Sequence, residues 1–307
     1  MHISVLKDEV IENLNLKEDS IIVDCTLGYA GDSSEILKRI KKGFLFAFDQ
    51  DSKAIEYSTN KLNQIGTNFT IIKSNFVNLK EQLEEHNVHK VDGVLFDLGV
   101  SSPQLDEKER GFSFHEDARL DMRMDKDNTL DAYQVVNEYS LKDLTRIFKE
   151  YGEDKFAYQI AKKIVNERQK KKIETTLELV EVIKRAVPMK EKIKKHPARQ
   201  IFQAIRIEVN HELDVIVPAL KSASEILNVG GRIEVITFHS LEDKIVKDYF
   251  KQLTKIDEKV KGLPNIPEEY LPDFKLVVNK AIVPTEEELS KNIRARSAKL
   301  RIIERIK

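Results

Sequence analysis

The sequence is poor in the residues that mark several large classes of protein. It contains one cysteine, Cys25, among 307 residues, and no tryptophan. A single cysteine excludes a disulfide within the chain and a metal site built from several cysteines. No apolar run approaches the roughly 18 residues that span a membrane, and acidic residues among the first fourteen argue against a secretory signal. These absences lead us to expect a cytoplasmic protein.

Charge is abundant, but it is unevenly distributed. The chain is 34% charged and 41% hydrophobic, and its formal net charge is −1. Residues 155–200 carry 14 Lys and Arg against 5 Glu, and residues 291–307 carry 7 Lys and Arg against Glu304 alone. Such asymmetry is typical of a surface that faces a polyanion. Lysine-rich helices that are simply solvated have the same composition, so both interpretations stay open.

The first hundred residues alternate between two patterns. Apolar, β-rich runs occupy residues 21–25, 44–48, 69–72 and 91–98. Helical patterns lie between them, at residues 33–41, 51–64 and 79–86. Fully apolar strands that alternate with helices predict a parallel sheet covered on both faces, and therefore an α/β fold.

The alternation stops after residue 100. Helical patterns then occupy residues 141–151, 157–168 and 177–186, with no strand pattern among them. We expect a long helix from about residue 198 to 227, interrupted or bent near Pro218 and ended by Gly230 and Gly231. Further strands are expected at residues 232–238, 274–282 and 298–306. The sequence therefore predicts a sheet domain of residues 1–102 and 200–307, with an all-helical domain of residues 103–199 inserted after the fourth strand.

Polar residues follow three of the predicted strands, at the edge where open α/β sheets bind ligands. The loop that begins at Asp24 contains Gly28 and Gly31, which let a ligand approach the backbone, and the next helix N-terminus attracts anions. Asp49 ends the second strand, where its carboxylate is placed to accept hydrogen bonds from both hydroxyls of a ribose, and Asp97 ends the fourth. The glycine spacing differs from Gly-x-Gly-x-x-Gly, which argues against a nicotinamide or flavin enzyme. The two β-rich runs at the C-terminus suit the methyltransferase variant of this sheet, which ends in an antiparallel strand.

Several of these residues have a purely structural alternative. Asp24 is also suited to brace its loop, and Cys25 to fill the core as a small apolar residue. Phe76 taken alone is more typical of a core than of a ligand site. Phe76 follows the third predicted strand, at the same edge of the sheet as Asp49. If the ribose belongs to an adenosine, this position also suits a side chain that stacks on or lines the adenine.

Longer motifs then show a family resemblance. They are residues 97–106 (DLGVSSPQLD), 110–114 (RGFSF), 120–124 (LDMRM), 202–210 (FQAIRIEVN), 238–244 (FHSLEDK) and 294–301 (RARSAKLR). In this order they resemble the ribosomal RNA small subunit methyltransferase H family, over nearly the whole chain. The resemblance implies a class I, Rossmann-like methyltransferase sheet and N4-methylation of a cytidine in the decoding region of 16S rRNA, within the small ribosomal subunit. The methyl donor would be S-adenosylmethionine.

The resemblance also implies roles for individual residues. The cofactor contacts map onto Ala30, Gly31, Asp32, Asp49, Phe76, Asp97 and Gln104. One position departs from the family pattern, because the residue after the loop glycine is usually His and here is Asp32. An aspartate there is still suited to meet the ammonium group of the cofactor's methionine end.

The acceptor side is less defined by sequence. A hydrogen-bond acceptor for the cytosine amino group is expected along residues 97–102 or at His239, which is equally suited to a structural role. Arg294 and Arg296 are expected to meet phosphates, together with Lys299 and Arg301, because few acids lie nearby in the sequence.

Other charged residues leave two interpretations open. Arg119 and Arg123 are expected to pair with Asp117 and Asp121. The lysines at 170–172 suit either a solvated helix end or an RNA contact.

Two other classes of function remain open. One is a methyltransferase of the same class with a different acceptor, such as a DNA cytosine amine or a protein side chain. The residues 97–102 replace the Asn/Asp-Pro-Pro-Tyr type of motif of amino-directed DNA enzymes, which disfavours DNA. The other is a non-catalytic ribosome assembly factor, which the intact Asp49, Asp97 and loop glycines disfavour. The sequence leaves the oligomeric state open, a homodimer included, and gives no sign of a metal.

Overall fold

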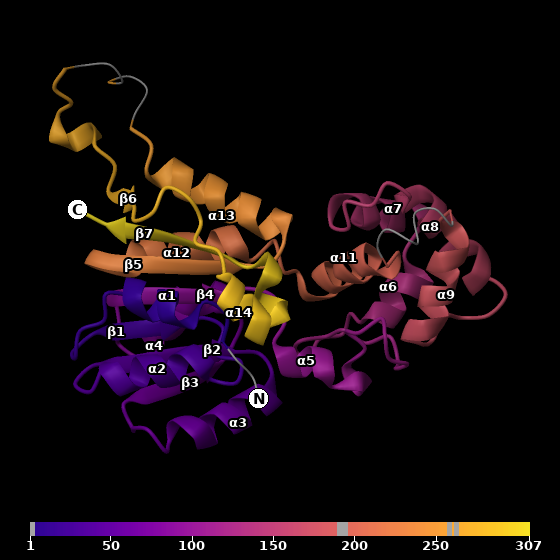
Figure 1. Cartoon of the computed structure of the whole chain (residues 1–307), viewed down its shortest axis with the longest axis horizontal. Helices are drawn as coiled ribbons and strands as arrows, with labels where there is room; N and C mark the ends of the chain where they lie inside the picture. The colour runs from indigo at the N-terminus through magenta and orange to yellow at the C-terminus, as the bar shows by residue number, and fades with distance from the viewer. Residues whose placement is uncertain (1–3, 189–195, 257–259, 261–263) are drawn as a thin grey trace. The chain divides into compact units, whose positions relative to one another are not determined.

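The chain forms two compact units in a computed structural model that describes residues 4–188, 196–256, 260 and 264–307. The first unit joins Met1–Gly99 to Asp214–Lys307, and the second is Val100–Leu213 (Figure 1). Each unit has its own hydrophobic core. No helix among the described residues is long and apolar enough to cross a membrane.

The first unit is built on one mixed sheet. Its strands are β1 (Ile21–Asp24), β2 (Phe44–Asp49), β3 (Phe69–Lys73), β4 (Val91–Asp97), β5 (Leu227–Thr237), β6 (Phe274–Leu276) and β7 (Lys299–Arg305). They lie in the order β3-β2-β1-β4-β5-β7-β6. The first five strands are parallel, whereas β7 runs antiparallel to β5 and β6 antiparallel to β7. The predicted α/β fold with an antiparallel end is confirmed.

Helices cover both faces of this sheet. They are α1 (Lys7–Asn13), α2 (Gly31–Arg39), α3 (Ser52–Leu62), α4 (Leu79–Glu85), α12 (Ile216–Ile226), α13 (Ser240–Leu253) and α14 (Glu286–Lys291). Buried side chains of α1 and α2 pack with Ile22, Leu45 and Leu95 on one face. On the other face α12 packs against α4 and α13. Both faces of the strands are therefore apolar, as their sequence indicates.

The second unit contains only helices and loops in its described residues, apart from one isolated bridge. The helices are α5 (Ser102–Asp106), α6 (Ala132–Glu138), α7 (Leu141–Glu150), α8 (Ala157–Arg168), α9 (Thr176–Ala186) and α11 (Ala198–Asn210). Polar caps define where several of them begin: Asp131, Ser140 and Thr175 each accept a backbone N–H at a helix N-terminus. Since α11 packs with α6, α7 and α9, it belongs to this unit. The division of the chain at Leu213 thus differs from the predicted boundary at residue 199.

Three predicted elements differ from the structure. The helix expected at 198–227 is two helices, because the chain turns at His211, whose φ is 51°. Pro218 lies in the first turn of α12, where its missing N–H would lack a partner in any case.

Strand β5 begins at Leu227 and contains Gly230 and Gly231 instead of following them. A Cβ at position 231 would lie 2.7 Å from the carbonyl oxygen of Asp92, so glycine is required for this strand pairing. The run at 274–282 yields only the short β6, with Ile282 in an isolated bridge to Leu300.

One acidic side chain lies in the core of the first unit. Glu234 of β5 is 0% exposed, and neither of its carboxyl oxygens has a hydrogen-bond partner among the described residues. Its backbone neighbours in the sheet are Leu95 and Ile302. Burial raises the pKa of Glu234 well above its ordinary value of 4.5. The carboxyl of Glu234 therefore keeps its proton to higher pH in the folded protein than in the unfolded chain.

This proton makes the stability of the protein depend on pH. Because the folded-state pKa of Glu234 is raised, the free energy of unfolding decreases as the pH rises from about 4.5 toward that raised value. We expect Glu234→Gln to remove this loss, so the variant gains stability relative to the parent between pH 5 and pH 8. Urea unfolding at both pH values measures the gain. The exposed Glu12→Gln is the control, and an equal difference at both pH values would contradict the prediction.

Candidate cofactor site

The carboxyl ends of β1, β2 and β4 bring Asp24, Asp49 and Asp97 to one edge of the sheet, because these strands are parallel neighbours. The loop after β1 is fastened to both neighbouring strands. The N–H of Cys25 donates to Leu95 O at 2.8 Å, and that of Leu27 donates to Phe48 O at 2.9 Å. The site is thus attached to the centre of the sheet.

Glycine and a left-handed residue shape the rest of this loop. Gly28 has φ of 48°, and Ala30, which precedes α2, has φ of 53°. A Cβ at Gly31 would lie 1.9 Å from Ser4 Oγ, so a larger residue would have to displace that side chain. The predicted cofactor residues Ala30 and Gly31 therefore have a backbone role, and they start α2 close against the N-terminal segment.

Asp24 braces the loop. Its Oδ1 accepts the N–H of Thr26 at 3.0 Å, and its Oδ2 accepts the hydroxyl of Ser33 at 2.6 Å. The side chain is 2% exposed, and burial raises its pKa. These contacts favour the structural alternative for Asp24, and Ser33 is a partner that the sequence analysis missed. Ser33 lies in the first turn of α2, close to the loop in sequence, and this position could have indicated a contact with the loop.

Asp49 combines a structural role with a free capacity for a ligand. Its Oδ2 accepts the N–H of Gly28 and its Oδ1 that of Asp51, both at 2.8 Å. The backbone N–H of Gln50 also favours the ionised carboxylate. Because the two oxygens together accept about four hydrogen bonds, capacity for a ligand remains. Burial raises the pKa of Asp49 to about 6, so the group is mostly ionised at neutral pH. The side chain lies at the end of β2, where the sequence analysis placed the ribose.

Two further carboxyls have unsatisfied oxygens. Asp32 Oδ1 and Asp97 Oδ1 are buried and have no hydrogen-bond partner among the described residues. Burial, and then the charge of Asp24, raise the pKa of Asp32 to about 7. Burial also raises the pKa of Asp97 well above its usual value, with Asp32 as the next cause. Unpaired acidic oxygens at the start of α2 and at the end of β4 fit a ligand that carries positive charge, as S-adenosylmethionine does in its sulfonium and ammonium groups.

Phe76 and Gln104 lie in different units. Phe76 is half-buried in a short 3-10 turn, with its ring edge-on to Phe96 of β4 at 5.5 Å. Gln104 lies in the second unit and caps α5: its Oε1 accepts the N–H of Ser101 at 3.0 Å. The capping motif Ser-x-x-Gln is visible in the sequence, but the sequence analysis did not use it.

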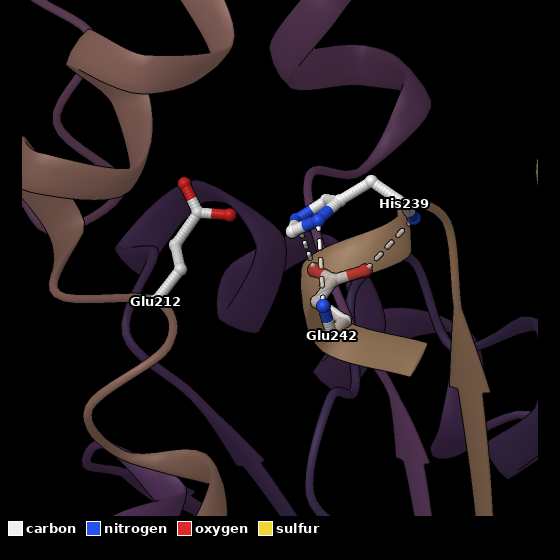
Figure 2. A group of neighbouring side chains, drawn as sticks. All are labelled: Glu212, His239 and Glu242. Carbon is white, nitrogen blue, oxygen red and sulfur yellow. Dashed lines mark hydrogen bonds and ion pairs between the residues drawn. The ribbon is translucent and has the colours of Figure 1, made fainter. Parts of the chain in front are cut away.

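His239 caps a helix. It precedes α13, and its Nδ1 accepts the N–H of Glu242 at 3.4 Å (Figure 2). The carboxylate of Glu242 accepts the N–H groups of Phe238 and His239 in return, at 2.8 and 3.3 Å. His239 Nε2 lies 3.0 Å from the same carboxylate. This reciprocal box favours the structural alternative for His239 over a contact with substrate.

The C-terminal basic cluster is partly neutralised. Asp243 of α13 accepts a hydrogen bond from Arg301 Nε at 2.7 Å and from Lys299 Nζ at 2.9 Å. Few acids lie near these two cations in the sequence, and their partner comes from a segment more than fifty residues away. Arg294 and Arg296 lie in the turn Ile293–Ser297 with exposed side chains.

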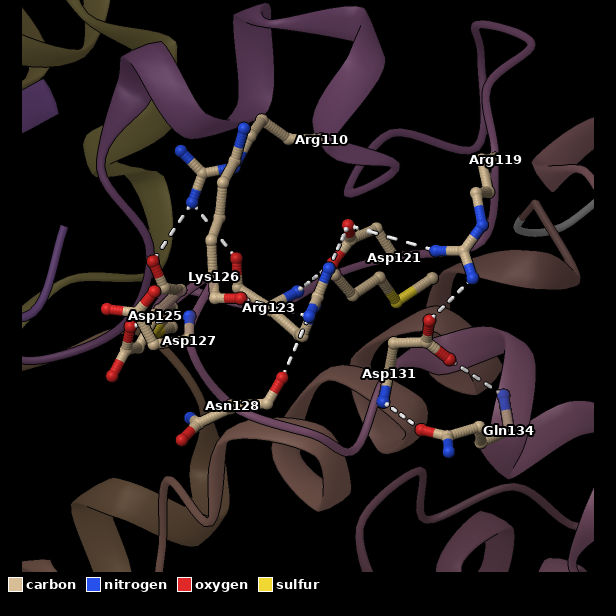
Figure 3. Close-up of polar contacts among 12 residues, drawn as sticks. Arg110, Arg119, Asp121, Arg123, Asp125, Lys126, Asp127, Asn128, Asp131 and Gln134 are labelled. Atoms are coloured by element: carbon tan, nitrogen blue, oxygen red, sulfur yellow. Dashed lines mark hydrogen bonds and ion pairs between the residues drawn. The ribbon is translucent and has the colours of Figure 1, made fainter. Parts of the chain in front are cut away.

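The loop at 119–128 of the second unit is held by its own arginines (Figure 3). Arg123 binds Asp121 at 2.8 Å and donates to the carbonyl oxygens of Lys126 and Asn128. The expected pair of Arg123 with Asp121 is thus present. Arg119 forms its shortest ion pair with Asp131, at 2.8 Å, and a longer one with Asp121, at 3.9 Å, whereas a pair with Asp117 is not found in the described structure.

Two residues of other motifs also fasten this loop. Arg110 is 3% exposed and donates to the carbonyl oxygens of Arg123 and Met124 (Figure 3). Asn210 of α11 accepts the N–H of Met124 and donates to Met122 O, both at 2.8 Å. The sequence analysis did not find this arrangement, since nothing in the sequence places residue 210 beside residue 124.

The sheet has the strand order and the antiparallel last strands of the class I methyltransferase fold. This fold defines the class of the protein. A family model described as the MraW methylase family matches residues 1–306. The chain belongs to this family, and it is an S-adenosylmethionine-dependent methyltransferase.

Two similar proteins illustrate the relation. A protein of Exiguobacterium sibiricum named ribosomal RNA small subunit methyltransferase H is 55% identical over 307 residues, which cover 100% of this chain and 98% of that protein. The crystal structure of an rRNA methylase from Streptococcus thermophilus is 12% identical, with a TM-score of 0.45, over 98% of this chain and 94% of that one. The family resemblance found in the motifs is confirmed.

Asp49 offers a direct test of the cofactor site. We expect Asp49→Ala to weaken S-adenosylmethionine binding at least tenfold, because hydrogen bonds to a charged group contribute about 1.5–3 kcal/mol each. Calorimetric titration measures the affinity. Asp19→Ala is a matched control, since Asp19 is exposed and lies at the amino end of β1, away from the site. An unchanged affinity in folded Asp49→Ala protein would exclude Asp49 from the site.

Proposed function

We propose that this protein transfers a methyl group from S-adenosylmethionine to the N4 amine of a cytidine in the decoding region of 16S rRNA. The observation that carries the proposal is the 55% identity, over the full chain, to a protein named ribosomal RNA small subunit methyltransferase H. Membership of a methylase family over residues 1–306 supports the reaction type. We propose the small ribosomal subunit as the place of the substrate and the cytoplasm as the location of the enzyme. A homodimer stays a prediction.

The cofactor supplies a methyl group on a sulfonium, which a nucleophile displaces in line. The protein therefore has to align the reactants more than it has to move protons, and alignment alone contributes roughly 7–11 kcal/mol in favourable cases. The proposed contacts divide this work: Asp49 accepts hydrogen bonds from the ribose, Phe76 lines the adenine, and Ala30 and Gly31 present backbone at the start of α2. Gln104 stays a proposed contact by resemblance alone.

The acceptor amine needs a different kind of help. The lone pair on the cytosine amine is delocalised into the ring, so an acceptor for its protons localises that pair and stabilises the charge that develops on nitrogen. Asp97 supports this role, because it ends β4 with an unpaired, buried Oδ1. His239 supports it less, since its Nδ1 already accepts the N–H of Glu242. The base must also be unstacked to reach the site, which suits a loop of folded RNA.

The RNA contact is proposed for the exposed arginines of the C-terminal turn. Arg294 and Arg296 are exposed, whereas Lys299 and Arg301 bind Asp243. The basic segment at 155–200 lends weaker support. Several of its lysines bind glutamates of the same unit, such as Lys171 to Glu178 at 2.6 Å. Residues 189–195 of that segment lie outside the described residues.

The alternatives make different predictions. A methyltransferase with another acceptor would label DNA or protein in place of rRNA, and an assembly factor would bind the subunit and transfer nothing. Buried acidic oxygens without partners disfavour the assembly factor, because such groups destabilise a protein that has no cation to bind. Tritium transfer from labelled S-adenosylmethionine to naked 16S rRNA, small subunits and DNA separates these cases.

The identity of the product tests the mechanism. Carbon-5 methylation of cytosine would require a covalent bond from a cysteine thiolate. Cys25 is 2% exposed, and burial raises its pKa well above its usual value, so the thiolate is disfavoured. We expect nucleoside digestion to give N4-methylcytidine without 5-methylcytidine, and Cys25→Ser to keep most of the activity. The carbon-methylated product, or complete loss of transfer in folded Cys25→Ser enzyme, would refute the proposal.

The salt dependence of binding tests the RNA surface. Phosphate contacts release counterions, so log affinity falls by about 0.7–0.9 per contact for each tenfold rise in salt. We expect the double change of Arg294 and Arg296 to Ala to reduce this slope by about one to two, with cofactor binding intact. Lys41→Ala is the matched control, since Lys41 is exposed and precedes the amino end of β2. An unchanged slope would show that the two arginines are only solvated.

A further inference from the structure

Acidic side chains gather on one face of the sheet, beneath the start of α2. Asp24 pairs in register with Leu95, and Leu95 pairs with Glu234, so the two acids flank that leucine on the same face. Asp97 lies two residues after Leu95 and therefore on this face as well. Asp32, in the first turn of α2, interacts electrostatically with all three acids.

The charges that face Asp32 are mostly of its own sign. Asp24 comes from β1, Asp97 from β4 and Glu234 from β5. The positive groups that act on Asp32 are Lys7 of α1 and Lys61 of α3. Lys61 Nζ donates to Tyr29 O at 2.9 Å, and no hydrogen bond or ion pair between either lysine and Asp32 is found in the described structure. Ser4 supplies the one side-chain hydrogen bond that favours ionised Asp32.

Asp32 and Glu234 differ in whether a ligand can reach their carboxyl groups. Glu234 is 0% exposed in the middle of β5, whereas Asp32 is 7% exposed and begins a helix beside the cofactor loop. The helix N-terminus attracts the carboxylate of an amino acid and repels its ammonium group. An amino acid bound there therefore needs an anion beside the helix start, and the unpaired Oδ1 of Asp32 is placed to supply it.

We propose that Asp32 binds the ammonium group at the methionine end of the cofactor, and that it loses a proton to solvent when it does so. This inference rests on the cofactor site of the proposed function. In the empty protein the neutral acid Asp32–COOH is favoured by burial among like charges. When the ammonium ion arrives, the proton leaves to water and a carboxylate–ammonium pair forms, so charge and atoms balance. Glu234 is 0% exposed, so the cofactor does not reach its carboxyl.

The amount of proton released follows from the acid strength of the empty site. Burial raises the pKa of Asp32 to about 7, and a bound cation lowers it again. Binding should then release about half a proton at pH 7, nearly one at pH 6 and almost none at pH 8.5. Affinity accordingly rises with pH, by up to about tenfold per unit below pH 7, and levels off above it.

Calorimetric titration in buffers of different ionisation enthalpy counts these protons. At pH 7 we expect about half a proton released by S-adenosylhomocysteine and much less by methylthioadenosine, a thioether like it that lacks only the amino-acid end. Because methylthioadenosine keeps the ribose, this comparison removes any contribution from Asp49. Asp32→Asn should abolish most of the difference between the two ligands, and Glu234→Gln should retain it.

Each outcome decides the inference. Equal proton release by the two ligands in the wild-type protein would overturn it, as would a wild-type count in Asp32→Asn protein. If Asp32→Asn does not fold, the comparison of ligands in the wild-type protein and in Glu234→Gln still decides. S-adenosylhomocysteine that binds without proton release refutes this inference alone, whereas methyl transfer to another acceptor refutes the proposed function alone.

Discussion

The parallel pairing of strands in the centre of the sheet determines where the acidic side chains of the candidate cofactor site lie. Because β1 lies between β2 and β4, three aspartates reach the same edge, and folding removes them from water together. Burying an ionised carboxylate costs several kcal/mol unless hydrogen bonds or cations offset it. Backbone N–H groups satisfy Asp24 and Asp49 in part, but one oxygen each of Asp32 and Asp97 stays unpaired. The fold thus accepts a loss of stability at the candidate cofactor site.

The fold was predictable from the sequence where one local signal dominates. The four apolar runs before residue 100 became β1 to β4, since a strand buried on both faces must be apolar throughout. Prediction failed where tertiary contacts override local preference. His211 adopts a left-handed conformation that its residue type does not indicate, and Gly231 lies inside a strand because its neighbour Asp92 leaves no room for a side chain.

The candidate site was predictable in position but not in detail. Strand ends identified Asp49 and Asp97 as site residues, because ligands bind at that edge of an open sheet. The hydrogen bonds from Gly28 to Asp49 and from Ser33 to Asp24 join segments that only the fold brings together. Glu234 had no signal at all: in the sequence it is one acid within an apolar strand, and its burial without a partner is a property of the folded sheet.

The contacts also change how the long motifs should be interpreted. Asp243 from 238–244 binds Arg301 from 294–301, and Asn210 from 202–210 holds the backbone of 120–124. Each of these four motifs therefore contributes one half of a contact within its unit, and a motif can be specific to a family for this reason alone. A charged residue in such a motif is a candidate for RNA binding only when its acid partners are accounted for. By that criterion Arg301, which binds Asp243, has a structural role. Arg296, whose side chain is exposed, is a better candidate for RNA binding than Arg301.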